Sequence, residues 1–192
     1  MKKLLLITSI ITAISSSAFA RTQGNQIGIE YLHSWAEHQY NANGDKFDDT
    51  AGGFGLHYKY AINLDNGFFV APGVFAEKLY TDSNDAQGDT AGLDYRYGAK
   101  VDLGYDITDG IAAYVTAGLG VLNYDVNWSS VGAKRSGNEA GLTYGAGLSF
   151  SATDNVALNL EYNFQNTDIQ TPGVTKADTD LHLLKVGLAY RF

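Results

Sequence analysis

The four histidines are the side chains best suited to acid–base chemistry: His33, His38, His57 and His182. An acyl-transfer or deacylation site needs a histidine beside a serine, with an acid in support. His33 and Ser34 are neighbours, so in a strand they point to opposite faces and cannot pair. No His-x-Ser pair occurs in the chain, and His182 has no serine near it in its own segment. The sequence therefore predicts no catalytic residues and a protein that is not an enzyme.

Metal and cofactor chemistry is also poorly supported. The segment 82–89 (DSNDAQGD) is acidic, but it lacks the glycine at the sixth place and the glutamate at the twelfth that a calcium loop requires. With Cys 0, the chain has neither disulfides nor thiolate zinc ligands. We expect no metal site and no cofactor.

The N-terminus has the pattern of an export signal. Lys2 and Lys3 precede an apolar stretch over 4–14, and Ala18-Phe19-Ala20 is typical of a cleavage site. We therefore expect a signal peptide over 1–20 and a single domain over 21–192, outside the cytoplasm. The net charge of −8 becomes −10 once Lys2 and Lys3 are removed, which argues against nucleic acid as a partner.

Most of the chain alternates between apolar and polar residues. In Leu93–Tyr105 the odd positions are apolar or aromatic and the even positions, Asp94 included, are charged or glycine. A strand sends alternate side chains to opposite faces, so one face is apolar and the other polar. Around Pro72 both faces are apolar, and we expect Val70, Pro72 and Val74 to share the apolar face. Eight such segments follow one another, which predicts an all-β protein.

The connections between these segments alternate in length. Those over 63–67, 106–110 and 152–155 are short and contain Asp, Asn or Gly, whereas those over 36–50, 81–90, 125–138 and 166–180 are longer and polar. An even number of strands with short turns at one end predicts an eight-stranded antiparallel up-and-down transmembrane β-barrel. The apolar face carries aromatic residues near both strand ends, as at membrane interfaces. A soluble barrel with its apolar face inside is the alternative.

The chain resembles the small eight-stranded outer-membrane barrels of Gram-negative bacteria, the group of OmpX, the opacity proteins and the OmpA membrane domain. The resemblance rests on the alternating ending Lys185–Phe192 and on Gly67–Gly73 (GFFVAPG). It implies a monomer in contact with outer-membrane lipid and lipopolysaccharide, with long loops extracellular and both termini periplasmic. It also implies that the barrel-assembly machinery reads Tyr190 and Phe192.

An eight-stranded barrel has an interior just wide enough for side chains. We expect the inward charges to form a mixed-sign cluster that fills it, with a gated small pore as the alternative. The residues expected there are Glu30, Arg96, Lys100, Glu161 and Lys185.

The long connections carry −7 of the net charge of −10. We expect the barrel to display them for adhesion, through a host surface or serum protein. A structural protein, a minor narrow channel and, least favoured, a lipopolysaccharide-modifying enzyme are the alternatives. The third connection alone combines apolar and basic residues, so we expect contact through Trp128, Val131, Lys134 and Arg135. Trp128 could instead anchor the barrel at the lipid headgroups.

Overall fold

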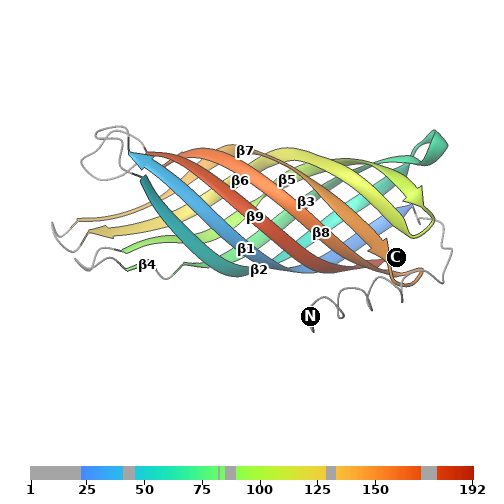
Figure 1. Cartoon of the computed structure of the whole chain (residues 1–192), viewed down its shortest axis with the longest axis horizontal. Helices are drawn as coiled ribbons and strands as arrows, with labels where there is room; N and C mark the ends of the chain where they lie inside the picture. The colour runs from blue at the N-terminus through green and yellow to red at the C-terminus, as the bar shows by residue number, and fades with distance from the viewer. Residues whose placement is uncertain (1–22, 41–45, 82, 85–89, 129–132, 170–176) are drawn as a thin grey trace, which may run out of the picture.

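The computed structural model is a closed, elongated barrel of tilted strands (Figure 1). It describes residues 23–40, 46–81, 83–84, 90–128, 133–169 and 177–192. The proposed signal peptide over 1–20 lies outside the described residues. No described segment forms a helix long and apolar enough to cross a membrane. The strands are β1 (Gly24–Tyr40), β2 (Lys46–Asn63), β3 (Phe68–Thr81), β4 (Ser83–Asn84), β5 (Thr90–Thr108), β6 (Ile111–Trp128), β7 (Ala133–Ser151), β8 (Val156–Ile169) and β9 (Ala177–Arg191).

Every long strand pairs antiparallel with two neighbours. The order β3-β2-β1-β9-β8-β7-β6-β5 closes through pairing of β3 with β5, and the two-residue β4 extends the pairing along β5. Asn25 and Phe192 exchange backbone hydrogen bonds of 3.2 and 3.0 Å, which join the start of β1 to the last residue of the chain. The predicted eight-stranded antiparallel barrel is confirmed.

Three short connections lie at the end of the barrel that also holds Gly24 and Phe192, which we call the turn end; the opposite end is the loop end. The first is a 3₁₀ turn over Asp65–Gly67. Its Asn66 has φ 62°, a left-handed conformation that asparagine tolerates better than most residues. The predicted short turns are thus present.

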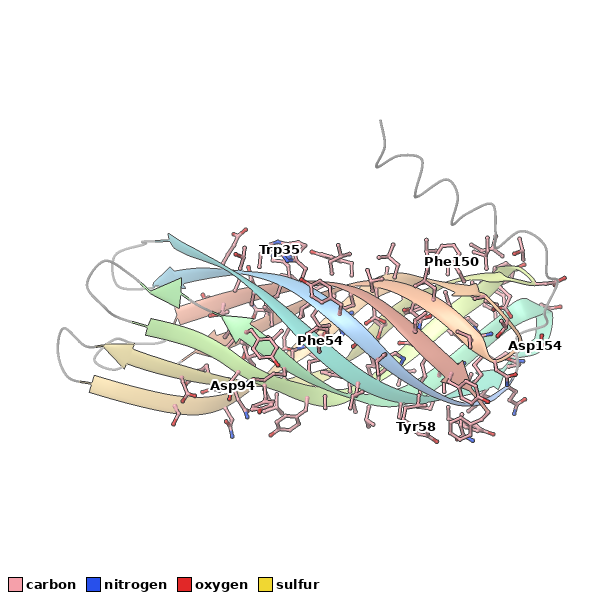
Figure 2. All side chains as sticks on the ribbon, turned by 90° about the horizontal axis from the view of Figure 1, so that it is seen from below. Trp35, Phe54, Tyr58, Asp94, Phe150 and Asp154 are labelled. Atoms are coloured by element: carbon pink, nitrogen blue, oxygen red, sulfur yellow. The ribbon has the colours of Figure 1, made fainter. Side chains whose placement is uncertain are left out.

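Burial alternates along the strands as the sequence predicted. On β1, Ile29 is 61% exposed whereas Glu30 is 7% exposed. Figure 2 shows Trp35, Tyr58 and Phe150 projecting from the outer surface. Pro72 also faces outward, and the pairing of β3 with β2 is interrupted there, so its missing N–H breaks no bond in that ladder.

The alternation fails at the loop end of β5. We expected Leu93 outside and Asp94 inside, but Leu93 is buried and Asp94 is partly exposed, in an ion pair with Lys78 on β3. The register with β6 shifts between Leu93 and Arg96. One extra residue in a strand moves the side chains on one side of it to the opposite face of the sheet.

The strands also run further than predicted at the loop end. β1 continues to Tyr40, β6 continues to Trp128, and β7 begins at Ala133, all within segments expected to be loops. Strand pairing can continue beyond the membrane because the partner strand still satisfies the backbone N–H and C=O groups. The change to polar residues in the sequence therefore marks the end of the lipid-facing apolar band and not the end of the strand.

Candidate functional site

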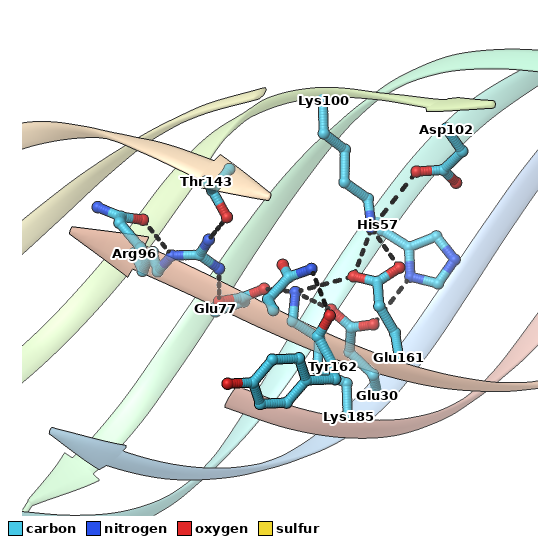
Figure 3. Close-up of polar contacts among 12 residues, drawn as sticks. Glu30, His57, Glu77, Arg96, Lys100, Asp102, Thr143, Glu161, Tyr162 and Lys185 are labelled. Atoms are coloured by element: carbon cyan, nitrogen blue, oxygen red, sulfur yellow. Dashed lines mark hydrogen bonds and ion pairs between the residues drawn. The ribbon is translucent and has the colours of Figure 1, made fainter. Parts of the chain in front are cut away.

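The lumen holds a layer of eight charged side chains at mid-height. Figure 3 labels all of them except Lys59. Four are acidic and four are basic, and all are buried. We call this set the charged layer; it consists of Glu30, Lys59, Glu77, Arg96, Lys100, Asp102, Glu161 and Lys185.

Lys185 connects three carboxylates contributed by three strands. Its Nζ donates a hydrogen bond of 2.5 Å to Glu77 Oε1, and it lies 3.4 Å from Glu161 Oε1 and 3.7 Å from Glu30 Oε1. The side chain of Lys185 is 1% exposed, so its charge is neutralised by protein groups. β3 is thereby tied to β9 across the lumen, and side-chain charges also link β9 to its neighbours β1 and β8.

The guanidinium group of Arg96 donates hydrogen bonds to side chains on three different strands. It donates hydrogen bonds of 2.6 Å to Glu77, 2.7 Å to Thr143 and 2.6 Å to Gln165. Sequence reasoning placed Arg96 in the lumen but missed Thr143 and Gln165 as its neutral partners, because uncharged residues give no electrostatic signal.

A second branch of the layer extends toward the turn end. Lys100 donates two hydrogen bonds of 2.7 Å to the carboxylate of Glu161, and Tyr114 donates one of 2.9 Å to the same group. Lys59 pairs with Asp102 at 3.0 Å. The structure thus brings Glu30, Arg96, Lys100, Glu161 and Lys185 into one connected network through Glu77, which the expected cluster did not contain.

Two apolar clusters bracket the charged layer. Toward the turn end lie Ala61, Phe69, Ala71, Ala112 and Tyr114. Toward the loop end lies a larger group, the leucine layer, whose members are Leu32, Ala36, Leu79, Leu93, Leu122, Tyr124, Leu181 and Leu183. These inward leucines were not predicted, because the polar face was read from its charges and glycines alone. In the described part of the chain, ion pairs and apolar clusters together line the lumen.

The outer face carries the aromatic residues expected at membrane interfaces. The rings of Trp35 and His182 stack with centroids 5.4 Å apart and 5° between their planes. The Tyr162 hydroxyl lies 2.7 Å from His182 Nδ1. The outward His182 is therefore held among aromatic rings, and His57, inside the barrel, lies 3.3 Å from Glu30. Among the described residues, no group of three or more His, Asp or Glu could hold a metal ion.

The residues predicted to form a loop contact are placed differently from expectation. Trp128 ends β6, and Lys134 and Arg135 lie near the start of β7, paired with Asn127 and Val126. These three therefore lie in paired strands and not in a loop. Val131 lies outside the described residues.

The last two aromatic residues lie on the outer face at the turn end. Tyr190 is 52% exposed and Phe192 is 64% exposed, and their rings stack 6.3 Å apart. Both are presented to the lipid side of the barrel next to β1, where the chain closes on itself.

Comparisons with known proteins agree with this architecture. A curated relative, the attachment invasion locus protein of Yersinia pseudotuberculosis serotype I (strain IP32953), is 28% identical over 196 residues, covering 100% of this chain and 98% of the relative.

Two solved structures share the fold. The attachment invasion locus protein of Yersinia pestis, in complex with the heparin analogue sucrose octasulfate, matches with a TM-score of 0.56 at 20% identity, covering 88% of this chain and 99% of that one. Neisserial surface protein A matches with a TM-score of 0.58 at 17% identity, covering 86% and 97%.

The family model described as the outer membrane protein beta-barrel domain matches residues 6–192. That match takes in every strand of the barrel described above. The chain therefore belongs to the outer membrane protein β-barrel family, and its place is the outer membrane of a Gram-negative bacterium.

Proposed function

We propose that this protein attaches the bacterium to a host surface through the loop end of its barrel. The observation that carries the proposal is that paired strands continue past the lipid-facing band and present acidic side chains there. Glu37 and Asp125 are exposed, and Glu37 lies directly opposite Asp180 in the pairing of β1 with β9. The similarity to an attachment invasion locus protein supports the same role.

The partner that fits this surface is a basic protein. Like charges placed opposite each other on neighbouring strands are destabilising, and a basic partner would relieve the repulsion. A sulfated polysaccharide would meet repulsion instead, although the Yersinia pestis relative was crystallised with a heparin analogue. Acidic side chains would equally keep lipopolysaccharide phosphates away from the loop end.

The test uses a non-adherent bacterium that displays the protein. We expect attachment to cultured host cells that Glu37→Gln with Asp180→Asn weakens several-fold and that added heparin leaves unchanged. Trp128→Ala with Lys134→Ala tests the contact proposed for the end of β6 and the start of β7. Attachment equal to that of the empty strain, with the protein folded at the surface, would rule out the adhesive role.

We also propose that the barrel is neither an enzyme nor a channel. Among the described residues, the outward His182 has the Tyr162 hydroxyl as its hydrogen-bond partner and stacks on Trp35, whereas acyl chemistry requires a serine beside the histidine. The charged layer is balanced and bracketed by apolar side chains, which favours a plug over a conducting path. Outer-membrane lipid, lipopolysaccharide and the barrel-assembly machinery are the expected contacts of a monomeric barrel.

A further inference from the structure

The lipid-facing side of the barrel carries a groove of about 650 Å³, which we call the outer groove. Residues directly opposite each other on neighbouring strands form rows that cross the sheet. The outer groove lies between two such rows of outward side chains. One wall is the row Leu158, Leu188, Ile29, Leu56 and Ala76, and the other is the row Val186, Tyr31, Phe54, Lys78 and Tyr95.

The floor of the outer groove is the row between these walls, whose side chains do not point toward lipid. It consists of Gly187, Glu30, Gly55 and Glu77. Glu30 and Glu77 point into the lumen, and the two glycines have no side chain. The groove therefore reaches the backbone of the sheet along its length.

The outer groove rises diagonally from the turn end toward the loop end. Leu158 lies near the turn-end start of β8, whereas Lys78 lies near the loop-end finish of β3. Neighbouring strands are about 4.8 Å apart, so a row that crosses from β8 to β5 is about 24 Å long. With strands tilted by about 45°, such a row covers about 17 Å of depth, close to one leaflet of a bilayer. These dimensions fit one acyl chain.

An ion pair lies at the loop end of the outer groove. The Lys78 ammonium group contacts the Asp94 carboxylate and lies 4.1 Å from the centroid of the Tyr95 ring. The two charged side chains are 32% and 36% exposed, so both remain accessible from outside the barrel. In Figure 2, Asp94 lies toward the loop end and Tyr58 toward the turn end. The groove thus presents one positive and one negative group beside its apolar walls.

We propose that the outer groove binds one molecule of phosphatidylethanolamine from the leaflet that meets the loop end. The lipid phosphate accepts a hydrogen bond from Lys78, the lipid ammonium group donates one to Asp94, and one acyl chain lies between the walls. This zwitterionic head group complements the ion pair, whereas an anionic head group would add a negative charge beside Asp94. Because an acyl chain has apolar neighbours in the groove and in the bilayer alike, the head group decides the preference.

A second groove on the lipid-facing side provides the contrast. It has a volume of about 630 Å³, crosses β5 to β9, and has Ala113 and Ala146 in its walls. Within the described part of the chain, no charged residue lines it. We therefore expect the second groove to accept acyl chains without preference for a head group.

The test counts the lipids that stay bound to the folded protein when a native mass spectrometer removes the detergent. The probes are phosphatidylethanolamine, phosphatidylcholine and phosphatidylglycerol with identical acyl chains. Phosphatidylcholine keeps both charges but lacks the N–H donors, and phosphatidylglycerol has a net negative charge. We expect one phosphatidylethanolamine to bind about fivefold more tightly than either of the others, as a partly exposed charged contact allows.

Three variants test the site itself. Asp94→Asn removes the charge that faces the lipid ammonium group, and we expect it to abolish the preference over phosphatidylcholine. Ala76→Leu places a larger side chain in the wall beside Lys78 and should weaken the binding of phosphatidylethanolamine about fivefold. Ala146→Leu makes the same change in the second groove and should leave that binding unchanged. Heat-modifiable migration on a gel verifies that each variant is folded.

Three results would overturn the proposal. The first is equal retention of the three lipids by the native chain. The second is a preference for phosphatidylethanolamine that survives both Asp94→Asn and Ala76→Leu. The third is displacement of phosphatidylethanolamine by an equal concentration of lipid A, which would assign the outer groove to lipopolysaccharide.

Discussion

Glu77 and Lys185 lie 108 positions apart in the chain, yet Lys185 Nζ donates a hydrogen bond of 2.5 Å to Glu77 Oε1 inside the barrel. Glu77 uses its other carboxylate oxygen to accept from Arg96 at 2.6 Å. One carboxylate therefore joins the strands β3, β5 and β9. Such a contact can form only once the strands have closed in the correct register.

Lys185→Ala should destabilise the barrel by about 3 kcal/mol, because it leaves buried carboxylates without their cation. The free energy of unfolding, measured by urea titration in lipid vesicles, provides the check. Lys78→Ala is the control, since Lys78 forms a partly exposed ion pair with Asp94 and should cost less than about 1 kcal/mol.

Restoring the charge balance should recover part of the free energy of unfolding that Lys185→Ala loses. After Lys185 is removed, Glu30 loses the ammonium group that lies 3.7 Å from its Oε1, while the imidazole of His57 stays 3.3 Å from its Oε2. Glu30→Gln in the Lys185→Ala background should therefore raise the free energy of unfolding above that of the single variant. Equal stability of Lys185→Ala and the native chain would contradict the electrostatic reading of the charged layer.

Much of the barrel could be predicted because its alternation has a physical cause that acts on each strand separately. The outward position of Ile29 and the inward position of Glu30 follow from residue type alone. Asp94 could not be placed, because the register shift between Leu93 and Arg96 depends on the partner strand. The contact of Glu77 with Lys185 depends on closure and stagger, which no local pattern contains. The inward positions of Leu122 and Leu183 differ from the polar lumen face that the alternation predicted, because the lumen near the loop end is apolar.

The lumen should remain closed to ions when the charged layer alone is cut. Arg96→Ser removes a fully buried cation, but the leucine layer above it still excludes water, and apolar constrictions block conduction by dewetting. In planar bilayers we expect no current steps from this variant. Adding Leu122→Ser and Leu183→Ser should produce them, provided that the protein still shows heat-modifiable migration. Current steps from Arg96→Ser alone would show that the charged layer, and not the leucine layer, blocks ions in the lumen.

Gly55 should resist substitution because it makes room for two members of the charged layer. An added Cβ would lie 2.9 Å from Glu30 Cγ and 3.0 Å from Glu77 Cγ. Gly55→Ala should cost about 1–2 kcal/mol in the free energy of unfolding, since crowding a packed interior forces side chains from their rotamers. Gly52→Ala on the same strand is the control, because its Cβ meets only the Tyr31 hydroxyl at 3.4 Å. Equal costs at both positions would show that the lumen can rearrange around Gly55.

Phe192 should affect assembly in cells more than folding in isolation. If the assembly machinery reads the chain end, Phe192→Ala lowers the yield of folded barrel in the outer membrane while refolding into lipid vesicles stays near that of the native chain. Phe68→Ala is the matched control, since Phe68 is also an outward aromatic at the turn end, 49% exposed and packed 5.0 Å from Tyr105. Its loss removes lipid contact without touching the last strand, so it should lower both yields alike. Gel migration of boiled and unboiled samples measures the folded fraction in both settings. If Phe192→Ala lowers both yields alike, then Phe192 acts only as an aromatic anchor at the membrane interface, as Phe68 does.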